Sequence, residues 1–125
     1  MSRSTTIQRG IGATMAVFGA LATAAPDRFT QGPVTAHSEN LTRMWALREV
    51  ALGAILMATS ATPARRPVLL ALTGLAAAEC VVNAGAAALS PSQRVASVAG
   101  AATFGAAGAY AWATARQDAF RAGGE

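Results

Sequence analysis

Cysteine, histidine and lysine are scarce or missing in this chain of 125 residues. The single cysteine, Cys80, excludes a disulfide within the chain, and we interpret it as a small buried apolar side chain. With His37 as the one histidine, the usual His and Cys sets of metal ligands cannot be assembled. Glycine-rich nucleotide loops, serine-hydrolase elbows and zinc-protease motifs are also absent from the sequence. The sequence therefore predicts no metal and no cofactor.

Charged residues are also few. They make up 13% of the chain, about half the share usual in a soluble domain, whereas hydrophobic residues make up 53%. The mean hydropathy of +0.37 is modest because alanine dominates the apolar content. The arginines fall singly or in pairs between apolar segments, without a basic patch, which argues against nucleic-acid binding despite a pI of 11.1. A membrane protein is favoured, with a water-soluble alanine-rich helical bundle as the alternative.

Four apolar segments divide the chain. The fourth is the clearest, because it runs without a charge between Arg94 and Arg116 and is long enough to cross a hydrocarbon core of about 30 Å. Long alanine-rich runs without strict alternation favour helix over strand. Short polar turns between the later segments predict antiparallel neighbours. We therefore expect one all-α domain, a four-helix up-down-up-down transmembrane bundle, with helices over residues 10–26, 41–62, 67–89 and 93–115.

The distribution of arginine predicts the orientation in the membrane. Six arginines lie at the two termini and between the second and third segments, against at most three (Arg28, Arg43 and Arg94) on the opposite side. The positive-inside rule then predicts a multi-pass protein of the inner (plasma) membrane with both termini in the cytoplasm. The alternative is that the first segment is a secretory signal, because Arg3 and Arg9 precede an apolar run ending in an Ala-x-Ala pattern before Pro26.

Three ionisable residues, Arg48, Glu49 and Glu79, interrupt these apolar segments. Each costs roughly 2.5–3.5 kcal/mol on insertion scales, so each needs a partner or a purpose. At the helical rise, Arg48 lies roughly 10 Å and Glu79 roughly 15 Å below the same surface. Antiparallel neighbours then bring the two side chains to nearly one level, which predicts an ion pair. Asn83, one turn after Glu79, is expected to add a hydrogen bond.

Two further residues belong to this cluster. Glu49 lies about 100° around the helix from Arg48, so it shares the polar interior or points toward the outer surface, where Arg43 is its partner. Trp45, one turn earlier, is expected to cover the cluster and stack on the Arg48 guanidinium. The candidate ligand-binding or proton-exchange residues are therefore Trp45, Arg48, Glu49, Glu79 and Asn83. The alternative is a structural ion pair that fixes which helices pack together.

Small residues predict close helix packing in the first and fourth segments. Gly12 and Ala16, followed by Ala20 and Ala24, recur every four residues and form one ridge, and Gly100, Gly105 and Gly108 give similar access in the fourth segment. Such ridges serve packing within the chain or a homodimer.

The run from Trp45 to Gly53, with Arg48 and Glu49 inside it, resembles a pattern in the DoxX-like family and in neighbouring families of small four-helix bacterial membrane proteins of unknown function. The resemblance implies an integral membrane protein whose third helix carries an acidic residue. Glu79 would match that residue. Neutral Asn83 departs from the family's aspartates, which argues against a role that needs two carboxylates there.

Three classes of function follow from these features. The first is an accessory, scaffold or assembly subunit, whose partners are membrane lipid and a homo-oligomer or larger membrane complex. The second is a proton-coupled transporter or lipophilic-ligand-binding protein that uses Glu79. The third is a membrane-embedded isomerase or cyclase with Glu79 or Glu49 as the acid–base group. The lack of a reaction motif favours a protein without enzymatic activity.

Overall fold

The computed structural model describes residues 1–122, which form four α-helices, one short 3₁₀ helix and no strand. The all-α class and the four helices predicted from the sequence are therefore confirmed. The elements, in chain order, are α1 (Arg3–Ala24), η1 (Pro26–Arg28), α2 (Ala36–Thr59), α3 (Arg65–Gly85) and α4 (Pro91–Ala122).

The helices begin earlier than the apolar segments, and polar caps set the first turns of α1 and α2. Ser2 accepts a hydrogen bond from the Thr5 amide and starts α1. Thr35 and Ser38 form a reciprocal capping box, which starts α2 well before the predicted position at residue 41. α4 continues past Arg116, because a charged residue outside an apolar run is fully compatible with a helix. The predicted boundaries were thus those of the apolar segments and not those of the helices.

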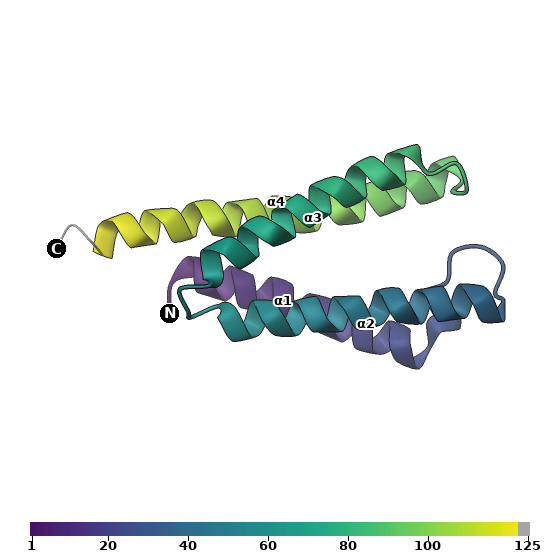
Figure 1. Ribbon diagram of the computed structural model, residues 1–125, viewed down its shortest axis with the longest axis horizontal. Coiled ribbons are helices and arrows are strands. Elements are labelled where there is room, and N and C mark those ends of the chain that lie inside the picture. The colour runs from purple at the N-terminus through teal and green to yellow at the C-terminus, as the bar shows by residue number, and fades with distance from the viewer. Residues whose placement is uncertain (123–125) are drawn as a thin grey trace.

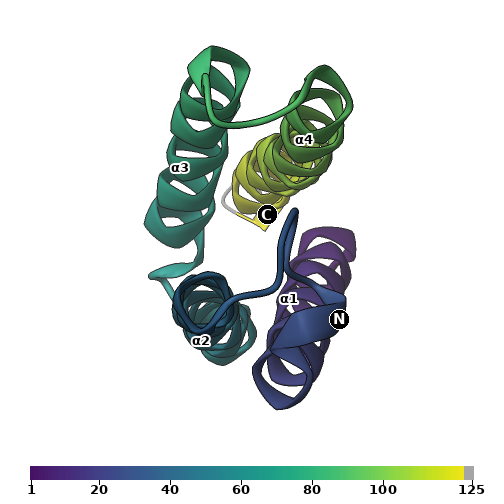
Figure 2. The ribbon, with the colours of Figure 1, turned by 90° about the vertical axis from the view of Figure 1, so that its right-hand side faces the viewer.

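The four helices are arranged as two antiparallel hairpins, α1 with α2 and α3 with α4 (Figure 1). The start of α1, the end of α4 and the α2–α3 connection lie at one end of the molecule (Figure 1), which we call the terminal end. Seen along its length, the molecule has one helix at each of four corners (Figure 2). Contact between the hairpins runs mainly through α1 and α4, whereas α2 and α3 touch little.

The core joins the two hairpins. Its buried members come from all four helices, and Leu56 and Leu69 are almost fully enclosed. Leu52, Val68 and Phe104 pack on its edge. The buried set is Ile11, Met15, Leu56, Leu69, Leu72 and Ala111.

Glycines allow the two helices of the first hairpin to approach closely. A methyl group on Gly12 would lie 2.7 Å from the Gly53 carbonyl oxygen, and one on Gly19 would meet the backbone of Ala46. The predicted ridge is thus partly wrong: Gly12 and Ala16 face α2, but Ala20 and Ala24 are exposed and Gly19 is buried instead. The packing repeat alternates between four and three residues, as the 3.6-residue helical period requires.

The second hairpin follows the prediction more closely. Gly105 faces Ala76, and Gly108 faces Thr73, so both glycines bring α4 against α3. A methyl group added to Gly100 would have no atom of another helix within contact distance, so Gly100 does not serve close packing as predicted.

One helix, α3, is long and apolar enough to cross a membrane by length and composition, with a mean hydropathy of 1.7 over its best window. α1, α2 and α4 do not meet the same criterion within the described residues.

Candidate functional site

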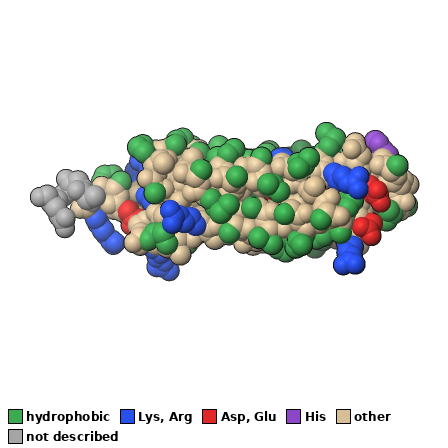
Figure 3. All heavy atoms as spheres, turned by 90° about the horizontal axis from the view of Figure 1, so that it is seen from below, with side chains coloured by type: hydrophobic (Ala, Val, Ile, Leu, Met, Phe, Trp, Pro, Cys, Tyr) green, Lys and Arg blue, Asp and Glu red, His purple; other side chains and the backbone are tan. Residues whose placement is uncertain are grey.

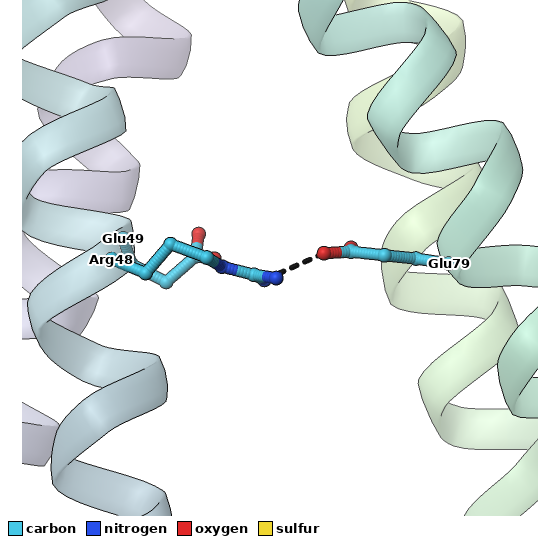
Figure 4. A network of polar contacts seen from close by, with 3 residues as sticks. All are labelled: Arg48, Glu49 and Glu79. Atoms are coloured by element: carbon cyan, nitrogen blue, oxygen red, sulfur yellow. Dashed lines mark hydrogen bonds and ion pairs between the residues drawn. The ribbon is translucent and has the colours of Figure 1, made fainter.

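Arg48 links the two hairpins. Its Nη2 atom lies 2.6 Å from Glu79 Oε1, across the gap between α2 and α3 (Figure 4). The same nitrogen donates a hydrogen bond of 2.9 Å to Glu49 Oε1 on its own helix. The ion pair predicted from the depths of Arg48 and Glu79 is therefore present. One guanidinium thus contacts two carboxylates.

Glu49 turns toward the interior, which decides between the two placements that the sequence left open. The residue is 8% exposed and is paired with Arg48 and not with Arg43. The long Arg48 side chain bends along the helix surface to reach it, so an offset of about 100° does not keep the neighbours apart (Figure 4).

These residues lie in a cleft of about 870 Å³ between the hairpins, which we call the hairpin cleft. Its floor is the edge of the core, formed by Met15, Leu52, Leu72 and Phe104. All five candidates named from the sequence line the cleft, namely Trp45, Arg48, Glu49, Glu79 and Asn83. The fold therefore brings the five together.

Two expected contacts within the cluster are not made. Asn83 lines the cleft without a hydrogen bond to Glu79, whose Oε1 atom is held by the ion pair with Arg48. The arginine–aromatic stackings among residues 1–122 involve Tyr110, Trp112 and Phe120, and not Trp45. Trp45 is 42% exposed and forms part of the cleft wall.

A second polar cluster, at the terminal end, was not predicted. Gln8 is fully buried and its amide donates to the Leu56 carbonyl oxygen at 2.9 Å, one of the carbonyls left open at the end of α2. Thr5 donates to the Ser60 carbonyl oxygen, and Arg65 donates to Thr5. Thus α1 caps α2. The spacing of Thr5 and Gln8, which places both on one helix face, could have indicated this cluster. Both residues precede the apolar segment, so the sequence did not predict them to be helical.

On the other side of this end, Ser4 is fully buried and donates to Asp118 Oδ2 at 2.7 Å, joining α1 to α4. These bonds hold the hairpins together at the terminal end. Among residues 1–122, no three His, Cys, Asp or Glu side chains are grouped closely enough to hold a metal ion.

Comparisons of the chain with protein-family models, with curated proteins and with solved structures give no match. The likeness to DoxX-like proteins therefore stays a prediction based on Trp45 to Gly53, and the site has to be interpreted from its own chemistry.

Proposed function

We propose that this chain is an integral membrane protein that binds a small lipophilic ligand in the hairpin cleft, with Glu79 and Glu49 facing a cationic or protonated group. One observation carries the proposal: a largely apolar cleft of about 870 Å³ contains Arg48, Glu49 and Glu79 as its ionisable residues. Ligand sites typically combine apolar walls with a few convergent polar groups.

The apolar surface supports the membrane placement. Large hydrophobic side chains point outward from every helix, among them Phe18 (53% exposed), Leu47 (57%), Leu70 (58%) and Val95 (70%). On the face drawn in Figure 3, arginine and acidic side chains gather toward the two ends, with apolar and small residues between them. Extensive exposed apolar surface marks a membrane or protein contact.

The orientation and the family belong to the same proposal. The arginine asymmetry supports a multi-pass protein of the inner (plasma) membrane with both termini in the cytoplasm. The start of α1 and the end of α4 lie at the terminal end (Figure 1), and six of the ten arginines belong to that end by their positions in the chain. The Trp45–Gly53 pattern and the four helices support a DoxX-like relationship.

The charges of the cluster favour a cationic ligand or an exchanging proton. With all three groups ionised, two carboxylates outnumber one guanidinium and leave one net negative charge. An apolar surrounding disfavours an uncompensated charge, so a proton or a bound cation stabilises the cleft. Both carboxylates are paired with Arg48, but the Glu79 side chain is 30% exposed against 11% for Glu49, so Glu79 is the carboxylate best placed to exchange partners.

Two probes of equal shape and opposite charge test this proposal. Tetraphenylphosphonium and tetraphenylborate are titrated into the purified protein in detergent, with Trp45 fluorescence of a Trp112→Phe variant as the signal. We expect the cation to bind and the anion to bind more weakly. Glu79→Gln should weaken cation binding, whereas Glu39→Gln, outside the cleft, should not. Equal binding of both probes, unchanged in Glu79→Gln, refutes the ligand site.

A subunit of a larger membrane assembly is the second candidate. The sequence alone ranks this function first, and the cleft reverses the order. The observation in its favour is an outward apolar face on α1, where Val17, Phe18 and Leu21 are each more than half exposed. Cross-linking in native membranes from cysteine placed at Phe18 tests it. A discrete larger species supports a subunit role, and a monomer alone contradicts it.

A further inference from the structure

The terminal end carries an excess of positive charge that the cluster in the cleft does not use. Among the described residues there, Asp118 is the one acidic side chain. At the opposite end, arginines lie beside acidic residues (Figure 3). The arginines of the terminal end are Arg3, Arg9, Arg65, Arg66, Arg116 and Arg121.

Aromatic side chains mark the same end. The Arg3 guanidinium lies 5.6 Å from the centre of the Tyr110 ring, and that of Arg66 lies 6.0 Å from the Trp112 ring. Tyrosine and tryptophan are enriched at the depth of lipid headgroups, where one edge of the ring is apolar and the other is wet. Arginines stacked on these rings therefore lie at the depth of phosphate groups.

A hollow of about 400 Å³ opens between α1 and α4 at this depth. Arg3, Tyr110, Gln117, Asp118 and Arg121 line it. Ser4 holds one carboxylate oxygen of Asp118, and the ion pairs found among residues 1–122 all involve Arg48. The two arginines of the hollow thus lie beside a fixed carboxylate without being paired to it.

We propose that this hollow binds the headgroup of an anionic phospholipid that also carries hydroxyl groups, such as phosphatidylglycerol. Arg3 and Arg121 hold the phosphate, because guanidinium groups form charged, directional hydrogen bonds to phosphate oxygens. Asp118 and the Gln117 amide oxygen accept hydrogen bonds from the headgroup hydroxyls. A phosphate ion without hydroxyl groups would be repelled by the Asp118 carboxylate and would donate no hydrogen bonds to offset that repulsion. This inference rests on the membrane placement proposed above.

Quenching of tryptophan by brominated lipid tests the inference. A protein with Trp45→Phe, Trp112→Phe and Tyr110→Trp carries its single tryptophan in the lining of the hollow, because the chain has two tryptophans and Tyr110 lines the hollow. The full chain is reconstituted in phosphatidylcholine vesicles that contain a small fraction of brominated phosphatidylglycerol or of brominated phosphatidylcholine. Excess quenching by the first reports its enrichment in the hollow. Arg3→Gln with Arg121→Gln is compared with a matched control, Arg28→Gln with Arg94→Gln, from the opposite end.

We expect excess quenching by phosphatidylglycerol in the parent and in the control. Substituting Arg3 and Arg121 together should lower the association constant of phosphatidylglycerol, relative to that of phosphatidylcholine, by about thirtyfold. Each arginine near an anionic surface contributes about 1 kcal/mol, and about 1.4 kcal/mol corresponds to a factor of ten. Equal quenching by both lipids, or equal loss in both variants, overturns the headgroup site. If inorganic phosphate abolishes the excess quenching by phosphatidylglycerol, the ligand of the hollow is free phosphate, and this result also overturns the headgroup site. Absence of quenching by either lipid refutes the membrane placement itself.

Discussion

Replacing Gly53 by alanine tests how the first hairpin is built. A methyl group at Gly53 would collide with the carbonyl oxygen of Gly12, and would lie 2.7 Å from the Ala16 nitrogen and 3.1 Å from its Cβ atom. Two of these three atoms belong to the backbone, so no side-chain rotation relieves the overlap. α1 and α2 have to separate along their contact, which loosens the core around Leu56.

The expected cost follows from this geometry. Overpacking a well-packed site costs about 1–3 kcal/mol, and a clash with backbone places Gly53→Ala in the upper part of that range. Gly74 on α3 is the matched control, because it is exposed and has nothing within contact distance. Gly74→Ala should instead stabilise its helix by up to about 1 kcal/mol through its higher helix propensity.

Denaturant unfolding in mild detergent, followed by circular dichroism, gives both free energies. The free energy of unfolding should fall in Gly53→Ala and stay level or rise in Gly74→Ala. Adding Ala16→Gly to Gly53→Ala should not restore stability, because the backbone contacts remain. A Gly53→Ala protein as stable as the parent would refute the close packing of α1 on α2.

Three further predictions concern the cleft, the terminal end and the first helix. Glu79→Gln should lower the free energy of unfolding by less than the about 3–5 kcal/mol lost with a fully buried partner, because Arg48 and Glu79 stay 41% and 30% exposed. A double-mutant cycle with Arg48→Gln measures the coupling, and zero coupling contradicts the ion pair. Gln8→Met should cost about 1–3 kcal/mol in thermal unfolding, because the buried Leu56 carbonyl loses its donor. Gln117→Met, at an exposed position, is its control and should be neutral. Alkali-washed membranes should retain the protein with a mass that includes α1. A mass that corresponds to a chain starting near Pro26 supports the signal-peptide alternative, and recovery in the soluble fraction contradicts the membrane placement.

The outcome at Glu49 illustrates where sequence reasoning stops. The level of Arg48 relative to Glu79 follows from a fixed rise per residue, so it was predictable from the distance of each residue to its segment end. The partner of Glu49 depends on how the flexible Arg48 side chain lies, and that side chain also reaches Glu79 on another helix. The contacts of Glu49 thus belong to a cluster that includes a residue distant in sequence.

The sequence by itself determined the class and the number of helices, because helix formation depends on local propensity and on the length of apolar runs. It also named five of the residues that line the cleft. Tertiary structure alone decided that a cleft exists. Gly12 and Gly53 draw α1 to α2, and hydrogen bonds such as Ser4 to Asp118 tie the hairpins at the terminal end. Contact between α2 and α3 remains slight, so space opens around Arg48. Separations between helices are set by side chains far apart in the chain, and no local pattern encodes them.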